Sequence, residues 1–290
     1  MSVLCIVAGV VLVLAILWEV FHDLFDPAGT GALSDWIGRA VFGAMRRRRS
    51  LLPAAGPVTL TIVILTWMVG LIVGFALIYS AGYPTQFRTS TDTIPVTQHG
   101  WIDVTYVSFE TLVTLGYGDV VPKLAVLRFV ATVEALLGFG LLTASLSSII
   151  LIYPALARLR TLALGVAHLA GGETSTGVSP AMTDSDVVLI GLAQDVTRTR
   201  IDFVHFPVIY FFGSDNEASS LATWTGVLQR YAREGADPQR PPHVRVAGAA
   251  LDRSLGGLAD ILSGRFATVS GDNRDEIFRA YAEAHLVERR

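Results

Sequence analysis

The sequence predicts an all-α membrane protein with three transmembrane helices and an α-helical cytoplasmic C-terminal domain. Of its 290 residues, 52% are hydrophobic, and the mean hydropathy of +0.52 is too high for an ordinary soluble protein. Three apolar stretches, at residues 1–25, 58–80 and 124–153, are long enough to cross a bilayer, which requires about 20 mostly apolar residues. In residues 154–290 the apolar positions instead recur at helical spacing, which is typical of helices packed in water.

The first stretch, residues 1–25, is apolar up to Glu19 and polar beyond it. A secretory signal peptide is the alternative interpretation of such a segment. Because it has neither a basic start nor an Ala-x-Ala cleavage pattern, we expect an uncleaved transmembrane helix. Its end places Glu19, His22, Asp23 and Asp26 on one face. We expect a solvated face that pairs with arginines, with a cation or proton site as the alternative.

The cytoplasmic connector at residues 26–57 contains most of the positive charge near the membrane. The loop at residues 81–100 has only Arg88, and positive charge stays on the cytoplasmic side, so the C-terminus is cytoplasmic and the N-terminus outside. In a voltage sensor, arginine recurs at every third residue of a membrane helix. The arginines in this connector are contiguous and do not follow that spacing. We interpret the run as a topology anchor that binds anionic lipid headgroups. It consists of Arg46, Arg47, Arg48 and Arg49.

The segment between the second and third stretches is the most informative one. Stacked rings of backbone carbonyls can replace the hydration shell of K⁺. To aim successive carbonyls at one axis, the backbone must alternate between ordinary and left-handed conformations, and glycine reaches the latter without a Cβ penalty. Gly-aromatic-Gly also occurs in tight turns, but the flanking apolar helices favour a selectivity filter at residues 114–119. The predicted K⁺-coordinating residues are Thr114, Leu115, Gly116, Tyr117 and Gly118, followed by Asp119.

Residues 101–153 resemble the pore domain of potassium channels, in particular the simple bacterial ones. The resemblance implies a re-entrant pore helix and filter, and a pore domain that spans residues 58–153. One departure is Leu115, where valine or isoleucine is more usual. The matching parts are the pore helix at 102–113, the filter at 114–119, Asp119 and Pro122 at the outer mouth, Arg128, and Phe139 to Ala144 of the inner helix at 124–153.

Each chain supplies one filter strand, whereas four strands are needed to encircle an ion, so we expect a homotetramer with the pore on its axis. The resemblance implies passive, potassium-selective transport across the plasma (inner) membrane of a bacterium. The expected partners are K⁺, further copies of the chain and lipids with anionic headgroups, with no cofactor and no nucleic acid. The sequence has no catalytic constellation, so we do not expect an enzyme. A potassium transporter subunit, a non-selective cation channel and a membrane-anchored sensor with a vestigial pore are the alternatives.

Two acidic residues are predicted to lie inside the membrane region. The resemblance places Glu110 behind the filter against Asp119, where a shared proton and a bracing role are expected, because adjacent carboxylates resist double ionisation. The alternative is a carboxylate that only packs the helix. Tyr106 is expected to support the filter as well. Glu134 lies within the third span, where an unpaired acid costs at least ~2.5 kcal/mol. It either hydrogen-bonds the base of a pore helix or adds negative potential near the cavity.

The inner helix is predicted to line the cavity with one of its faces. Gly138 and Gly140 each lose ~1 kcal/mol of helix propensity, and a gating hinge and close helix packing remain open as explanations. Pro154 is expected to kink or end the helix. The face predicted to line the cavity contains Leu136, Phe139, Gly140, Thr143 and Ser147.

The C-terminal region is predicted to be helical throughout. The glycine-rich residues 171–177 predict a loop or hinge, and the apolar run from Phe203 to Phe212 a buried helix continuation broken at Pro207, with a strand as the alternative. This region has no Gly-rich nucleotide-binding fingerprint. We therefore do not expect it to be the usual ligand-binding domain that regulates potassium conductance. Tetramer assembly, ligand sensing and partner binding all remain open. The helical patterns cover residues 184–202, 215–234, 242–264 and 273–287.

Overall fold

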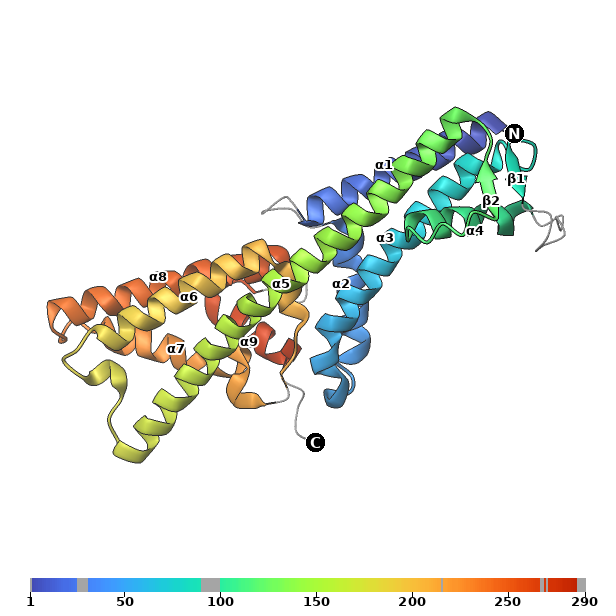
Figure 1. Cartoon of the computed structure of the whole chain (residues 1–290). Coiled ribbons are helices and arrows are strands. Elements are labelled where there is room, and N and C mark those ends of the chain that lie inside the picture. The colour runs from blue at the N-terminus through green and yellow to red at the C-terminus, as the bar shows by residue number, and fades with distance from the viewer. Residues whose placement is uncertain are drawn as a thin grey trace. The chain divides into compact units, whose positions relative to one another are not determined.

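The computed structural model describes residues 2–24, 31–89, 100–214, 216–266, 269 and 271–285. It divides into two compact units, of which the first comprises Met1–Asp35 and Thr61–Ile150, and the second Trp36–Leu60 and Leu151–Arg290. Within these described residues, three helices have the length and composition to cross a membrane, as the sequence predicts, and the fold class is confirmed (Figure 1). These are α1 (Ser2–Leu24), α3 (Ala55–Ser80) and α5 (Ala125–Thr176).

In the first unit, α1 and α3 approach each other closely at glycines. A Cβ atom at Gly9 would lie 2.5 Å from the carbonyl oxygen of Gly74, and one at Gly70 would lie 2.6 Å from Cδ1 of Ile16. Gly70 and Gly74 are four residues apart and therefore lie on the same face of α3. In lipid, the acyl chains are as apolar as the side chains, so the hydrophobic effect does not drive helices together. Helices associate there through close packing, which small residues such as glycine allow. Glycine thus brings the two backbones together.

The filter segment lies between α4 (Gly100–Leu112), which agrees with the predicted pore helix, and a short strand. This strand, β2 (Val120–Pro122), pairs antiparallel with β1 (Phe87–Thr89), so that Phe87 is opposite Pro122. The amide of Lys123 extends the connection by donating to the carbonyl of Gln86 at 2.8 Å. The sequence did not predict these strands. They join the residues after the filter to the residues after α3.

The predicted end of the inner helix near Tyr153 is wrong, because α5 continues through Pro154 to Thr176. Its 52 residues correspond to a length of about 78 Å, more than twice the thickness of a hydrocarbon core. Beyond Pro154, its side chains at Leu156, Leu159 and Val166 are buried in the core of the second unit. Their burial outweighs the hydrogen bond that proline removes.

The predicted loop at residues 171–177 is also helical as far as Thr176. Helix α5 ends at Gly177, which has a φ of +71° and whose amide donates to the carbonyl of Glu173 at 2.8 Å. A left-handed glycine immediately after a helix is a common way to terminate it. Of the glycines in this segment, Gly177 alone has the terminating role.

The second unit is a helical bundle, and the four predicted helical patterns are confirmed. The predicted break at Pro207 is confirmed as well, since α6 ends at His205 and a 3₁₀ helix begins at Pro207. The helices are α2 (Ala32–Met45, shared with the first unit), α6 (Val187–His205), α7 (Leu221–Gly235), α8 (Pro242–Arg265) and α9 (Arg274–His285). The 3₁₀ helices are η1 (Arg49–Ala54), η2 (Pro180–Met182), η3 (Pro207–Phe211) and η4 (Glu217–Ser219).

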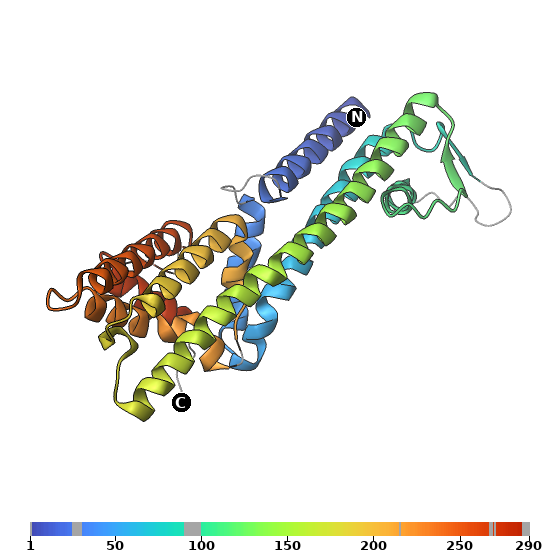
Figure 2. The same ribbon diagram turned by 60° about the vertical axis from the view of Figure 1, so that its left-hand side comes forward.

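Helices α6 and α8 of this unit lie side by side (Figures 1 and 2). Leu251, Leu255, Leu258 and Leu262 form the fully buried stripe of α8, at the spacing of one helix face. Near its end, the ring of Phe266 stacks on that of Tyr210 with centroids 3.9 Å apart. The core of the second unit is thus one contiguous apolar cluster.

Candidate ion-conducting site

The backbone of the filter segment has left-handed conformations at every second residue. The φ angles are +57° at Thr114, +58° at Gly116 and +77° at Gly118. The predicted alternation is therefore present, and glycine occupies two of the three positions, where it avoids the Cβ penalty. Thr114 adopts the same conformation although it has a side chain. The segment begins directly at the end of α4, where the amide of Leu115 donates to the carbonyl of Glu110 at 2.8 Å.

The filter segment is open on one side in a single chain. Residues 113–118 are all exposed, and Leu115 and Tyr117 are 52% and 72% exposed. Irregular backbone at membrane depth is tolerated only where protein covers it or where it lines a water-filled path. A single chain does not enclose an ion, so the assignment of Thr114, Leu115, Gly116, Tyr117 and Gly118 to K⁺ coordination stays a prediction that requires further copies.

Behind the filter, the structure brings together the three predicted supporting residues. Glu110 is 4% exposed, and its Oε2 accepts a hydrogen bond from the amide of Tyr117 at 3.1 Å. The hydroxyl of Tyr106 donates to the two carboxylate oxygens of Asp119, at 3.2 and 3.1 Å, and also interacts with Glu110. In the described part of the chain, the carboxylates of Glu110 and Asp119 are thus linked through Tyr106 rather than by a direct hydrogen bond. Their bracing role stays a prediction.

Glu134 is fully buried in the first unit, between three helices. Its two carboxylate oxygens accept hydrogen bonds from the hydroxyls of Ser108 on α4 and Tyr79 on α3, both at 2.5 Å. The oxygen of Ser108 also lies 3.0 Å from the carbonyl of Ile72. Of the two alternatives for Glu134, the structure shows a hydrogen bond to α4, the predicted pore helix, although at Ser108 within the helix rather than at its base. Its partners Ser108 and Tyr79 were not predicted, since they are 26 and 55 residues away in sequence.

The two glycines of the inner helix have different surroundings. A Cβ atom at Gly138 would collide with the carbonyl oxygen of Leu112, at the end of α4, whereas one at Gly140 would have nothing within 4 Å. Close packing therefore accounts for Gly138, which lets α5 touch the end of the pore helix. Among the residues that the structure describes, no contact accounts for Gly140.

The face of α5 that was predicted to line the cavity is exposed in the single chain. Leu136 and Phe139 are 67% and 61% exposed, and Gly140, Thr143 and Ser147 are exposed as well. The hydroxyls of Thr143 and Ser147 donate to backbone carbonyls four residues earlier, both at 2.9 Å. This face lies opposite the buried residues of the helix and is available to line a path, which stays a prediction.

The acidic end of α1 has a role that neither alternative included. Oε1 of Glu19 accepts hydrogen bonds from the amides of Leu33 and Ser34, at 2.6 and 3.3 Å, and Oδ1 of Asp23 accepts one from the amide of Gly31 at 3.3 Å. These amides are at the N-terminus of α2, where unpaired donors and the helix dipole favour negative charge. Both carboxylates cap α2. Asp26 lies outside the described residues.

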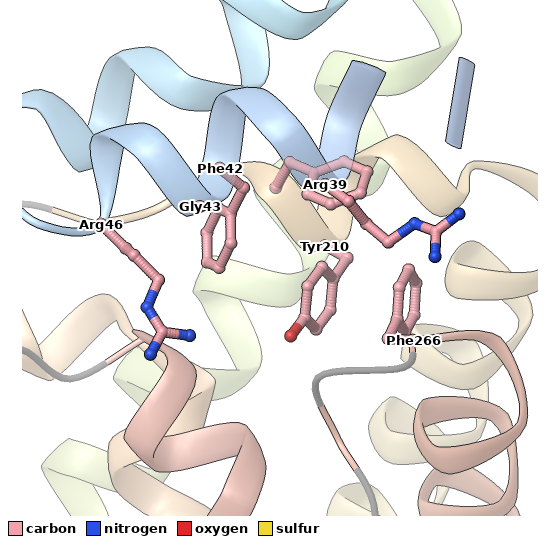
Figure 3. A pocket seen from close by; sticks show the side chains of 7 residues that line it. Arg39, Phe42, Gly43, Arg46, Tyr210 and Phe266 are labelled. Carbon is pink, nitrogen blue, oxygen red and sulfur yellow. The ribbon is translucent and has the colours of Figure 1, made fainter. Parts of the chain in front are cut away.

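The arginine run follows directly after α2. Arg46, Arg47 and Arg48 are exposed, while the side chain of Arg49 lies outside the described part of the structure. Figure 3 shows Arg39 and Arg46 on either side of the rings of Phe42, Tyr210 and Phe266, around a cavity of about 30 Å³. Such a cavity has room for one or two water molecules and no larger ligand. The role of these arginines as an anchor on anionic lipid stays a prediction.

Comparisons with known proteins agree with this geometry. Residues 62–153 match the ion channel family. The chain is also 26% identical, over 267 residues, to the uncharacterized membrane protein YdjJ of Bacillus subtilis strain 168, and the alignment covers 86% of this chain and 76% of that protein. No solved structure matches the chain significantly. The matched residues include α4, the filter segment and the first part of α5, so this membrane protein contains a region, residues 62–153, that is similar to the ion channel family.

Proposed function

We propose that this chain is the subunit of a potassium-selective channel that conducts K⁺ passively across the plasma membrane. The observation that carries the proposal is the alternation of left-handed backbone at Thr114, Gly116 and Gly118, directly after a pore helix and inside an ion channel domain. This alternation allows successive carbonyls to point to one axis, where they replace the hydration shell of a bare K⁺. The pore helix also directs the negative end of its dipole toward the ion path.

The functional channel is proposed to be a homotetramer. The filter segment and the face of α5 around Phe139 are both exposed in one chain, as expected for surfaces that other copies and the ion path cover. Four copies around one axis give each ring of the filter four carbonyls. The distribution of arginines supports an N-terminus outside and a cytoplasmic C-terminus, with Arg46 to Arg49 on the anionic headgroups of the inner leaflet.

The residues behind the filter are proposed to hold its shape. Glu110 fixes the amide of Tyr117, which lies between the two left-handed glycines. Tyr106 fixes Asp119, where the chain turns into β2. Because the outer half of the filter segment is held at Tyr117 and Asp119, its carbonyl rings keep their spacing when an ion leaves. Glu134 would then hold the pore helix itself on α3 and α5.

A non-selective cation channel is the second candidate, and Leu115 is the observation that favours it. Potassium filters more usually have valine or isoleucine at this position, and here the leucine residue is 52% exposed in the single chain. A filter that is not held rigidly admits ions of different radius, because its carbonyls can then adapt to each ion.

Ion efflux from liposomes that contain the purified full-length chain tests the proposal. We expect K⁺ efflux to exceed Na⁺ efflux and Gly118→Ala to abolish it, since alanine is strained at a φ of +77°. Gly43→Ala is the matched control, because this glycine lies in α2 with open space around it. Equal K⁺ and Na⁺ efflux would favour the second candidate. The mass of the particle in mild detergent tests assembly separately, and a monomer would contradict the tetramer.

A further inference from the structure

Tyr79, Ser108 and Glu134 form a fully buried polar cluster in the first unit, which three oxygen–oxygen contacts hold together. Oε2 of Glu134 lies 2.5 Å from the hydroxyl of Tyr79, and Oε1 lies 2.5 Å from that of Ser108. The Ser108 oxygen also lies 3.0 Å from the carbonyl oxygen of Ile72. These are hydrogen-bond distances, and two oxygens at such a distance attract each other only when a proton lies between them. The cluster therefore requires three protons.

The two hydroxyl groups supply only two of these protons, because a carbonyl has none. If Tyr79 and Ser108 both donate to Glu134, the contact between Ser108 and Ile72 lacks a proton. If Ser108 donates to Ile72 instead, its contact with Glu134 lacks one. The third proton has a single source in the cluster, the carboxyl group of Glu134, which when protonated offers one O–H donor and keeps an acceptor oxygen.

No positive charge pairs with Glu134 in the described part of the chain, where the ion pairs involve other acids. The basic side chains that precede it in the sequence, Lys123 and Arg128, are exposed and donate to the carbonyls of Thr85 and Pro122. A fully buried carboxylate without a cation is strongly disfavoured relative to the neutral acid. Burial and the proton count thus lead to the same protonation state.

We propose that Glu134 is a neutral carboxylic acid at neutral pH and that its proton is a structural part of the first unit. Oε1 donates this proton to Ser108, Ser108 donates its own to the carbonyl of Ile72, and Tyr79 donates to Oε2. The hydrogen bonds then run from α3 to α5, on to α4 and back to α3. An ionised Glu134 would leave one of the three contacts as two facing oxygens without a proton.

The proton holds the helix that leads into the filter segment. Glu134 and Gly138 are four residues apart and share one face of α5, as Ser108 and Leu112 share one face of α4. Gly138 lies so close to the carbonyl of Leu112 that a Cβ atom there would collide with it. Helix α5 therefore holds two successive turns of α4, and Glu134 is a positioning residue for the pore helix. An effect on conduction rests on the proposed function, whereas the protonation state does not.

Infrared difference spectroscopy of the full chain in lipid nanodiscs at neutral pH tests this protonation state. The carbonyl stretch of a protonated carboxyl group is separate from the bands of ionised carboxylates and of the peptide amides. We expect the wild type to have such a band that Glu134→Gln loses, while glutamine retains one donor and one acceptor for Ser108 and Tyr79. Glu173→Gln is the matched control, because Glu173 accepts two hydrogen bonds from Arg230, at 2.6 and 2.7 Å. This variant should lose a carboxylate band and leave the protonated band unchanged.

Tyr79→Phe gives a second signature in a chain that keeps Glu134. Without a hydroxyl that donates to Oε2, the protonated band should remain and move to higher frequency, because a hydrogen bond to a carbonyl oxygen weakens the C=O bond. Tyr83→Phe is the control, since its hydroxyl donates to Asp103 at 2.6 Å instead, and it should leave the frequency unchanged.

Loss of a carboxylate band rather than a protonated band in Glu134→Gln would overturn the proposal, and so would an unshifted band in Tyr79→Phe. Neither outcome depends on ion conduction. If the protonated band is present but the chain conducts no K⁺, the neutral Glu134 stands and the proposed function fails. If the chain conducts K⁺ and Glu134 is ionised, the proposed function stands and this inference fails.

Discussion

The two units bury their polar groups in different ways. In the first unit, one carboxylate, that of Glu134, joins hydroxyls from two further helices, and single glycines set the approach of the helices. In the second unit, the core is a contiguous apolar cluster, and its buried acid Asp202 pairs with Arg158 on the margin of that core. This difference is the one expected if the first unit lies in lipid and the second in water. Hydrophobic burial drives folding in water, whereas in lipid packing and hydrogen bonds must specify the contacts.

Helix α5 shows both regimes within one element. Its first part exposes Leu136, Phe139 and Leu142, while its later part buries Leu156, Leu159 and Leu162. Exposing an apolar side chain to lipid or to a neighbouring copy has no hydrophobic cost. Exposing the same side chain to water is unfavourable. We therefore expect point substitutions in the first unit to act through individual contacts, and those in the second unit through the shared core.

The largest expected effect is that of Glu134→Ala. This change leaves the hydroxyl of Tyr79 without an acceptor, at about 1–3 kcal/mol for the orphaned donor, and leaves Ser108 only the carbonyl of Ile72 as its acceptor. The thermal unfolding midpoint of the full chain in detergent measures the loss. Glu134→Gln is the control, because it keeps one acceptor oxygen and should retain part of the stability. If Glu134→Ala is as stable as the wild type, the carboxylate does not specify the packing of the first unit.

A smaller effect is expected from Gly138→Ala. The added methyl group would collide with the carbonyl of Leu112, and such overpacking costs about 1–3 kcal/mol. The paired substitution Gly140→Ala meets no neighbour and should increase helix propensity by ~1 kcal/mol. Unfolding midpoints of the two variants, measured together, should therefore move in opposite directions. A shift of the same sign and size would refute the assignment of Gly138 to close packing.

In the second unit, Asp202→Asn should cost less than the loss of Glu134. Arg158 donates two hydrogen bonds to Asp202, at 2.9 and 2.6 Å, but its side chain is 46% exposed, so water replaces part of what is lost. We expect a loss near the lower end of the about 1.5–3 kcal/mol of charged hydrogen bonds. Asp195→Asn removes an exposed pair with Arg198 and should change stability by less than ~0.5 kcal/mol. Equal effects of the two variants would show that burial of Asp202 contributes nothing.

The smallest expected effect is a pH dependence of the second unit that comes from His285. Burial, together with the charge of Arg46, holds the pKa of His285 below its ordinary value of 6.5, although the carbonyls of Tyr210 and Tyr281 raise it. The folded state therefore favours the neutral ring, and the unfolded state gains protons first as the pH falls. Stability from this group is present above pH 6.5 and is lost below it.

Amide hydrogen exchange in α9, measured from pH 7.5 to 5, detects this dependence after correction for the intrinsic exchange rate. We expect protection to fall at low pH in the wild type and to fall less in His285→Gln. His243→Gln is the control, because His243 is exposed. In the described part of the structure, its ring lies within hydrogen-bonding distance of the carbonyl of Asp184. An identical pH dependence in His285→Gln and the wild type would exclude His285 as its source.

Local sequence was sufficient to predict the membrane helices and the filter backbone. Apolar runs of about 20 residues specify a span by themselves, and Gly116 and Gly118 indicate left-handed positions because other residues are penalised there. Local sequence failed at Pro154, since the burial of Leu156 and Leu159 in a core made by distant helices outweighs the local preference of proline. The partners of Glu134 and the pairing of β1 with β2 depend on segments far apart in the chain, so no short pattern could reveal them.

The reversal potential of the full chain in a planar bilayer, with K⁺ on one side and Na⁺ at equal concentration on the other, tests the proposed function most directly. A filter whose carbonyl rings at Thr114 to Gly118 replace the hydration shell of K⁺ predicts a current carried by K⁺. The reversal potential should then be displaced from zero by at least about 59 mV, since a tenfold preference for a monovalent ion corresponds to that voltage. A reversal potential of zero, with a measurable current, would contradict a potassium-selective pore.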